Sequence, residues 1–291
     1  METREIVVGT DGSGWSATAV RWAALEARRR NAPLRIVHAF DWHRQPARYG
    51  GAGETRAVAE SEAESIVNIA VVQAKEAAPD LTIRPDVTVG APATALLDAA
   101  ENAALLVVGN RGRGGFGSLM LGSVGQRVVT HATCPVVVVR GARQTFDGPI
   151  VVGADGSASS NDAVGLAFQL AADHDHPLVA VRTYEPPSPP WGGKVQPVVY
   201  DVKERDTAEH EALTASLAPW RAKFPDVSVE EIVAHGPASS VLVGVSHTSQ
   251  LVVVGSRGHG SFTGTVLGSV GLQLVHHAEC PVLVNRVPTD A

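Results

Sequence analysis

The chain has 291 residues, of which 44% are hydrophobic and 19% are charged, and these ordinary values exclude a disordered or collagen-like protein. At about 150 residues per domain, the length predicts two domains. The 24 basic and 30 acidic residues give a net charge of −6, which argues against a general nucleic-acid binder because such a protein needs a basic surface to neutralise phosphates.

Short apolar strand patterns alternate with amphipathic helical patterns along the first half of the chain. The strand patterns cover residues 5–10, 34–40, 86–89, 105–109 and 135–140. The helical patterns cover residues 15–30, 54–78, 93–101 and 123–132. Such alternation, with strands that are apolar on both faces, predicts an α/β doubly wound parallel sheet covered by helices on both sides.

The second half of the chain repeats the first. The segment IVVGTDGS at 6–13 returns as IVVGADGS at 150–157, and residues 105–140 align without gaps to 251–286 with 21 identities in 36 positions. The period is the size of a whole domain, so we interpret the chain as one domain present twice. We place the first domain at 1–143 and the second at 148–291. The first 144 residues carry 16 basic and 14 acidic residues (+2), and the remainder carry 8 and 16 (−8).

The sequence favours an intracellular setting. No apolar run approaches the roughly 18 to 20 residues of a membrane span, and the first residues lack the apolar core of a signal peptide. Only two cysteines occur, each followed by proline and an apolar run, which predicts buried, inert thiols in a reducing compartment. We therefore expect a cytoplasmic protein.

A glycine-rich segment follows the fourth strand pattern of each half. Both copies share the frame Gly, two residues, Gly, nine residues, Gly-Ser, at 109–123 and 255–269. Glycines let a ligand approach the backbone closely, and the serine is placed to cap the next helix, whose N-terminal N–H groups favour a phosphate. Doubly wound sheets also bind ligands at the carboxyl ends of their strands. The alternative is a long glycine-rich turn with an ordinary serine cap.

Familiar catalytic motifs are missing or fail on their context. Residues 112–117 match the dinucleotide-binding motif G-x-G-x-x-G, but the second copy has Thr263 at the last position. No Asp or Glu occurs between Asn102 and Phe146, so the acidic residue that would bind a ribose in that motif is missing. The only Gly-Lys pair is followed by Val195, which excludes a Walker A loop. Neither G-x-S-x-G nor H-E-x-x-H occurs, which argues against hydrolase and zinc-protease chemistry.

An aspartate ends the first strand of each half, next to the expected position of the glycine segment. Asp11 and Asp155 could accept a ribose hydroxyl or hold a phosphate-bound Mg²⁺. The Asp-Gly-Ser sequence also fits a turn in which Asp or Ser caps the first helix. Recurrence in both halves at the same distance from the glycine segment favours a site.

Three other groups have a structural explanation that we favour over a functional one. Arg28-Arg29-Arg30 is expected to close a helix, where cations complement the helix dipole. Residues 173–176, Asp-His-Asp-His, are expected in the turn before a strand rather than in a metal site. His131 and the histidine pair at 276–277 are expected at helix ends rather than in catalysis.

With the strand-end aspartate, the glycine frame and a closing Cys-Pro-Val-x-Val strand in order, each half resembles a universal stress protein domain of the ATP-binding subclass. The resemblance covers nearly the whole chain twice. It implies two tandem five-stranded parallel sheets of the Rossmann-like, adenine nucleotide α-hydrolase-like type, with strand order 3-2-1-4-5 and ATP at the carboxyl ends of strands one and four. Family members pair through their last strands, which implies that residues 136–139 and 282–285 meet within the chain and that the whole chain forms a homodimer.

Carried over residue by residue, the resemblance implies one ATP site in each half. The first site would contain Gly9, Asp11, Ala39, Val108, Gly109, Arg111, Gly112, Gly122, Ser123 and Val124. The second would contain Gly153, Asp155, Thr183, Val254, Gly255, Arg257, Gly258, Gly268, Ser269 and Val270. The two aspartates would face ribose and phosphates and any Mg²⁺ held through the nucleotide. His38 precedes Ala39, but Arg182 precedes Thr183, so the two sites need not have equal affinity.

The resemblance implies a nucleotide-dependent regulator in a stress or dormancy response, which acts through a protein partner that the sequence does not name. A slow ATPase or nucleotide-transfer enzyme on the same sites is an alternative, in which Arg111 and Arg257 would stabilise charge. A scaffold that binds another adenine ligand, such as cyclic AMP, is a further alternative. Binding is favoured over catalysis because no lysine or positioned base for phosphoryl transfer is recognisable.

Overall fold

The computed structural model describes residues 4–40, 54–113, 121–141, 147–185, 202–258 and 267–286. The middle of each glycine segment and most of the connector between the two halves lie outside these residues. The site is therefore described from the ends of the glycine segments and from the elements around them.

Strands and helices alternate within the described residues of each half. The first half contains β1 (Ile6–Gly9), α1 (Gly14–Arg29), β2 (Leu34–Phe40), α2 (Glu54–Ala77), β3 (Ile83–Val89), α3 (Pro92–Ala99), β4 (Leu105–Gly109), α4 (Ser123–His131) and β5 (Val136–Val139). The second half contains β6 (Ile150–Gly153), α5 (Ala158–His174), β7 (Leu178–Tyr184), α6 (Val202–Lys223), β8 (Val229–His235), α7 (Ala238–Val245), β9 (Leu251–Gly255), α8 (Ser269–His277) and β10 (Val282–Asn285). The predicted α/β alternation is confirmed.

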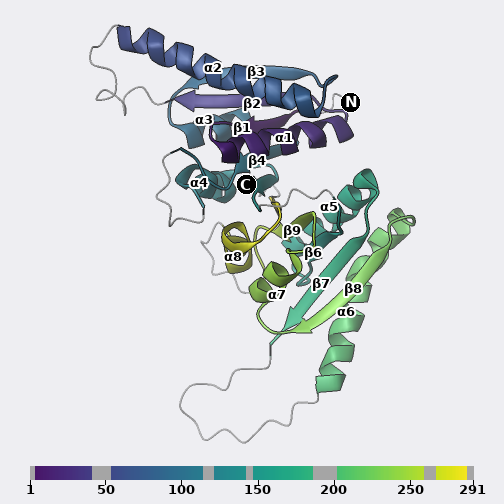
Figure 1. Ribbon diagram of the computed structural model, residues 1–291. Helices are drawn as coiled ribbons and strands as arrows, with labels where there is room; N and C mark the ends of the chain where they lie inside the picture. Colours follow the sequence, from purple (N-terminus) through teal and green to yellow (C-terminus); the bar gives the residue numbers. More distant parts are fainter. Residues whose placement is uncertain are drawn as a thin grey trace, which may run out of the picture.

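The strands of the described residues form one ten-stranded sheet of order β3-β2-β1-β4-β5-β10-β9-β6-β7-β8. Within each half the order is 3-2-1-4-5 and every pairing is parallel, as expected. The two last strands pair antiparallel, with Val137 opposite Leu283, which confirms that residues 136–139 and 282–285 meet. The two expected five-stranded parallel sheets are therefore joined edge to edge, and the pairing of β5 with β10 covers two strand edges that would otherwise be exposed. Figure 1 shows the two halves on either side of this seam.

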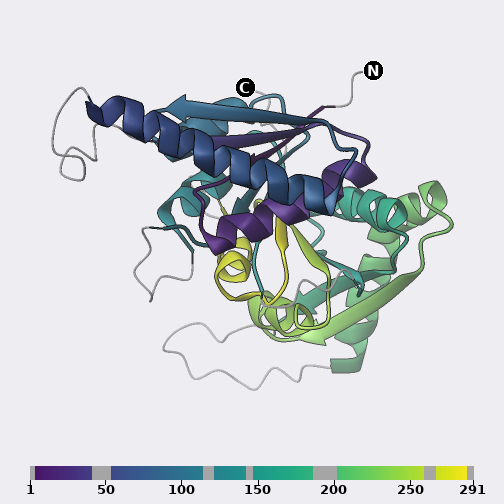
Figure 2. The ribbon, with the colours of Figure 1, turned by 45° about the horizontal axis from the view of Figure 1, so that its top comes forward.

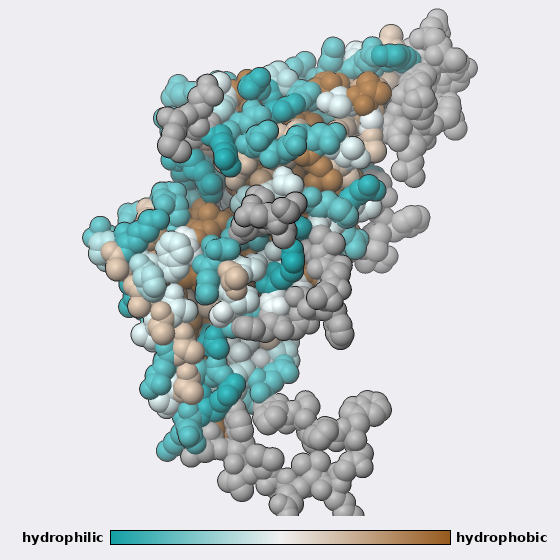
Figure 3. Space-filling view, turned by 180° about the vertical axis from the view of Figure 1, so that it is seen from behind, coloured by the Kyte–Doolittle hydropathy of each residue, from teal (hydrophilic) through white to brown (hydrophobic). Residues whose placement is uncertain are grey.

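Two layers of helices cover the sheet. One apolar core packs α1, α2, α5 and α6 against one face, and a second packs α3, α4, α7 and α8 against the other. Figure 2 shows α1 and α2 side by side along the first of these faces. The inner strands are buried on both faces, which explains their continuous apolar sequences. Seen from behind, the surface is mainly hydrophilic, with small apolar groups between polar side chains (Figure 3).

A buried polar contact joins the two halves on the first of these faces. The Glu26 carboxylate on α1 is fully buried and lies 2.6 Å from Nε of Arg30 and 2.9 Å from Nε2 of His174 on α5. Burial raises the pKa of Glu26, but His174 and Arg30 outweigh it and lower that pKa to about 2. The prediction that residues 173–176 form a turn is wrong for its first half, because α5 continues through His174.

Several local expectations hold in the structure. The first helix ends at Arg29, and α4 and α8 end in the expected histidines. Cys134 and Cys280 are buried, and burial raises the pKa of the two thiols to about 11 and about 12. Among the described helices, none combines the length and apolar content that a membrane span requires.

Candidate functional site

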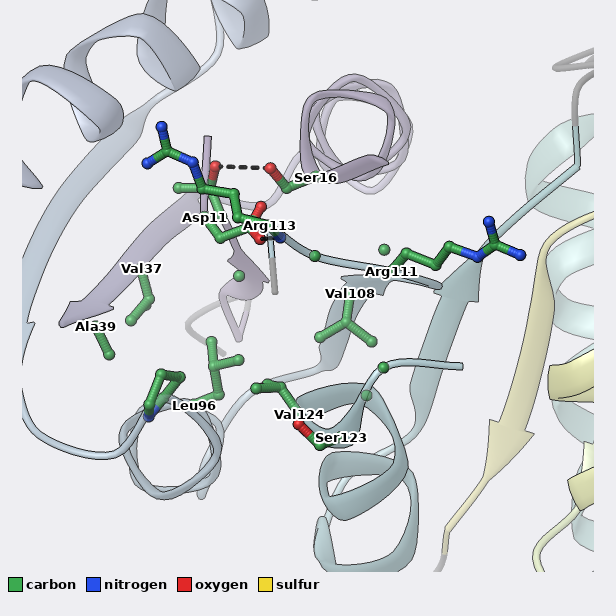
Figure 4. Close-up of a pocket in the computed structure, with 17 residues that line it drawn as sticks. Asp11, Ser16, Val37, Ala39, Leu96, Val108, Arg111, Arg113, Ser123 and Val124 are labelled. Atoms are coloured by element: carbon green, nitrogen blue, oxygen red, sulfur yellow. Dashed lines mark hydrogen bonds between the residues drawn. The ribbon is translucent and has the colours of Figure 1, made fainter. Parts of the chain in front are cut away.

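Among the described residues, each half has a cavity at the carboxyl edge of its parallel sheet. The first has a volume of about 350 Å³ and the second of about 650 Å³. In the first half, the cavity lies between the ends of β1, β2 and β4, helix α3, and the N-terminus of α4 (Figure 4). The second cavity is built from the corresponding elements of its own half.

The predicted residues of each site converge on its cavity. All ten residues expected in the first site line the first cavity, and all ten expected in the second line the second. Their role in binding a ligand stays a prediction. The structure adds residues that were not predicted, namely Thr10, Ser16, Val37, Pro92, Leu96, Arg113 and Gly125 in the first cavity and Ala154, Ser160, Val181, Ala238, Leu242, Leu267, Gly271 and Leu272 in the second.

The first turn of α4 opens onto the cavity. Gly122 is the N-cap residue, and its N–H donates to the Asn110 carbonyl at 2.9 Å. Ser123 is already the first helical residue and makes no capping hydrogen bond, so the prediction that it caps α4 is wrong. The same correction holds for Ser269, because Gly268 is the N-cap of α8. The N–H groups of this turn therefore lack a side-chain cap, and such groups together with the helix dipole favour an anion.

The carboxylate of Asp11 lies against the start of the glycine segment. It accepts hydrogen bonds from the N–H of Ser13 at 3.0 Å, the Ser13 hydroxyl at 2.6 Å and the N–H of Arg113 at 2.6 Å. Burial raises the pKa of Asp11, but these hydrogen bonds outweigh it and lower the pKa below its ordinary value. A Cβ at Gly112 would lie 2.5 Å from Oδ2, so glycine is required for this approach.

Both interpretations of the Asp-Gly-Ser sequence apply. Ser13 is the N-cap of α1 and accepts a hydrogen bond from the N–H of Ser16 at 3.2 Å. Asp11 lines the cavity at the same time. The second half repeats this arrangement, with Ser157 as the N-cap of α5 and Asp155 in the second cavity.

An apolar wall faces the glycine segment across the cavity. Val37 and Ala39 of β2 form one part of it, and Leu96 of α3 forms another. The contribution of α3 was not predicted. Leu96 and Leu242 occupy the same position in the repeat, and this shared apolar position was the signal that could have identified the wall.

The two halves differ at the strand residue that precedes Ala39 in the first half and Thr183 in the second. Nδ1 of His38 lies 2.7 Å from the Thr10 carbonyl oxygen, and burial lowers the pKa of this histidine. At the corresponding place Arg182 lies 3.5 Å from the Ala154 carbonyl and donates to Glu209 at 2.5 Å. The two copies therefore differ in the hydrogen bonds made at this position of the repeat, and the expected difference in affinity stays a prediction.

The side chain of Arg111 does not point into the first cavity. Figure 4 shows it directed away from Ser123 and Val124, toward the second half of the chain. Its guanidinium lies over the ring of Trp15, 5.5 Å from the ring centroid. Arg111 therefore lines the cavity without directing its charge into it, contrary to the role in charge stabilisation considered from the sequence.

Known proteins are similar to this chain in sequence and in fold. The family model of the universal stress proteins matches residues 2–140 and 148–286. A universal stress protein of Mycolicibacterium smegmatis is 33% identical over 97% of this chain and 96% of its own length. The crystal structure of a universal stress protein from Archaeoglobus fulgidus covers 100% of this chain and 98% of its own, with 16% identity and a TM-score of 0.69.

A further solved structure covers one half of the chain. It is a universal stress protein in complex with cAMP, which is 32% identical, covers 48% of this chain and 98% of its own, and has a TM-score of 0.38. The two matches of the family model and the full-length relatives agree with the internal repeat. The chain belongs to the universal stress protein family and contains two copies of the family's domain in tandem.

Proposed function

We propose that each half of the chain binds one ATP molecule and that the protein acts as a nucleotide-dependent regulator. The observation that carries this proposal is the composition of the cavity. One side offers the first turn of a helix and close-packed glycine backbone, and the opposite side is apolar. These surfaces suit the two ends of a nucleotide, because phosphates bind helix N-termini and an adenine ring is accommodated by apolar side chains.

Asp11 and Asp155 supply the polar contact between these two ends. The hydrogen bonds that lower the pKa of Asp11 keep it ionised, and an ionised carboxylate accepts hydrogen bonds from ribose hydroxyls. Each is the only carboxylate among the described residues that line its cavity. One carboxylate suits Mg²⁺ held chiefly by the phosphates of the nucleotide, since Mg²⁺ usually has one or two protein carboxylates plus substrate oxygens and water.

Binding is favoured over fast phosphoryl transfer. No lysine occurs among the described residues that line either cavity, and the Arg111 side chain points away from the first. Phosphoryl transfer depends on cations placed on the transferred group. The regulatory role then requires a protein partner that distinguishes the loaded from the empty state. Because β5 and β10 pair within the chain, a homodimer would use another surface.

Identification of the bound nucleotide tests the proposal. Protein purified without added nucleotide is denatured, and the released small molecules are separated by chromatography. Nucleotide-free protein is then titrated with ATP, ADP and cyclic AMP in the presence of Mg²⁺. We expect ATP to bind and to raise the melting temperature, since a ligand of the native state stabilises it. The proposal would be overturned if no ATP co-purified with the protein and added ATP did not bind. Tighter binding of cyclic AMP than of ATP would identify cyclic AMP as the ligand. Rapid release of phosphate from bound ATP would establish an ATPase.

A further inference from the structure

Two arginines cross from the last strand of one half to a helix end of the other. Arg140 directly follows β5, and its Nη1 donates to the carbonyl oxygen of Val275 in α8 at 2.5 Å. Arg286 directly follows β10, and its Nη1 donates to the carbonyl oxygen of Val129 in α4 at 2.6 Å. Arg140 and Val129 align with Arg286 and Val275 in the repeat, so the two contacts are equivalent and reciprocal.

Each arginine donates a hydrogen bond to a carbonyl oxygen that has no partner within its own helix. The carbonyls of the last helical turn have no intrahelical partner, and the C-terminus of a helix carries partial negative charge. In α8 the N–H of the C-cap residue bonds to Leu274, and the next carbonyl, that of Val275, receives Arg140. A charged donor forms a stronger hydrogen bond than a neutral one. Each arginine therefore holds the last turn of a helix from the opposite half.

The same two helices carry the candidate sites at their other ends. Helix α4 begins at Ser123 in the first cavity, and α8 begins at Ser269 in the second. Each helix has nine residues, which corresponds to a length of about 14 Å. A movement of its last turn therefore moves the N–H groups of its first turn, because so short a helix moves as a rigid body.

Arg140 also borders the glycine segment of its own half. The N–H of Asn110 donates to the carbonyl of Val139 at 3.1 Å, immediately before Arg140. Burial lowers the pKa of Arg140, Glu279 opposes that change, and the charge of Arg111 adds to it. Arg140 thus lies between the loop of the first site and the helix of the second. Arg286 has the same relation to Arg257 in the second half.

We propose that Arg140 positions the second nucleotide site and that Arg286 positions the first, so that each site depends on an arginine supplied by the other half. Both act as positioning residues through α8 and α4 rather than through contact with the ligand. The identity of the ligand rests on the function proposed above. The tandem chain is then a single binding unit, because the end of each last strand contacts the glycine segment of its own half through its backbone and the helix of the other half through its arginine.

Site-specific affinities test this dependence. Gly122→Asp leaves only the second site, and Gly268→Asp leaves only the first, so each affinity for ATP with Mg²⁺ is measured by calorimetry in the matching background. Arg140→Met should weaken the second site about two- to fivefold, the range that a cation at a helix C-terminus typically supplies, and leave the first unchanged. Arg286→Met should do the reverse. Arg84→Met, in an exposed ion pair on β3, is the matched control.

Unchanged affinity at the first site shows that the Arg140→Met variant is folded. Arg140→Lys, which keeps the charge, should recover part of the affinity that Arg140→Met loses at the second site. Hydrogen exchange provides a readout that needs no nucleotide. Arg140→Met should accelerate exchange in residues 269–277 but not in 123–131, and Arg286→Met should do the opposite. Equal effects on both helices, effects confined to the arginine's own half, or no effect would overturn the inference. If each arginine substitution accelerated hydrogen exchange in the helix of the opposite half but the protein bound no ATP, the dependence of each helix on the other half would be supported and only the proposed ligand would be overturned.

Discussion

Substitution of Gly122 should change ligand binding without lowering the stability of the fold. A Cβ at this position would meet no atom closer than 3.8 Å, and its φ of −70° is open to any residue. Aspartate and asparagine are both favoured at a helix N-cap. Gly122→Asp and Gly122→Asn should therefore leave the stability of the protein unchanged or slightly increased, and their difference isolates one negative charge beside the first turn of α4.

The size of the effect follows from the distance between the new carboxylate and a bound phosphate. A unit charge about 5 Å from another, at an effective dielectric constant of about 20, contributes about 3 kcal/mol of repulsion. This corresponds to an affinity loss of more than about 100-fold for each phosphate charge at that distance. Asparagine, of nearly the same size, contributes only the steric part of the effect. We therefore expect Gly122→Asp to abolish measurable binding at the first site and Gly122→Asn to weaken it less.

Calorimetric titration with ATP measures this directly as the number of molecules bound per chain. The unaltered chain should bind two, and Gly122→Asp should bind one with the affinity of the second site. Thermal unfolding of both variants is the control for stability. An unchanged stoichiometry in Gly122→Asp, or equal losses in the aspartate and asparagine variants, would refute the assignment of phosphates to the N-terminus of α4.

Three further predictions concern the fold. Gly109→Ala would place a Cβ 2.8 Å from the backbone oxygen of Trp15, so we expect its free energy of unfolding, measured in urea, to fall by about 2 kcal/mol. Gly14→Ala, whose Cβ would have no atom within 4 Å, should not destabilise the protein. Equal effects of the two substitutions would contradict this explanation. The folded pKa of Glu26 is about 2 against an ordinary 4.5, so its contribution is complete above pH 4.5 and is lost as the pH falls toward 2. Glu26→Gln should flatten the pH dependence of unfolding in that window, and an unchanged slope would count against it. The two cysteines, buried and with raised pKa values, should react with a thiol reagent at pH 8 only as fast as the protein unfolds, so rapid labelling of native protein would contradict their burial.

The fold could be predicted largely because its inner strands are buried on both faces. Their continuous apolar runs and the repeat of a whole domain leave few alternatives to a doubly wound sheet. Strand β3 was predicted three residues too short, because it begins at Ile83 and runs through Arg84 and Pro85. It lies at one edge of the sheet, where charged residues and proline are tolerated, so composition does not reveal its start.

The candidate site could be predicted where sequence and backbone geometry coincide. Glycines and aspartates recur at fixed distances in both halves, and the carboxyl ends of parallel strands bring them together. The wall from α3 was missed because an apolar residue on a helix is typical of a core position, and only the recurrence of Leu96 as Leu242 sets it apart. The capping role of Ser123 was wrong because the Asn110 carbonyl holds Gly122 as the N-cap. The pairing of β5 with β10 was expected from the family resemblance, but the arginine contacts across it were not, because they join residues 135 and 157 positions apart in the sequence.

The central claim is that each half of this chain holds one ATP. Titration of the nucleotide-free, unaltered chain with ATP and Mg²⁺ tests it most directly, with the single variants Gly122→Asp and Gly268→Asp measured alongside. The account predicts two molecules bound per chain, one in each variant and none when the two substitutions are combined. Binding of no ATP, of a single molecule per unaltered chain, or of ATP in the double variant would contradict it.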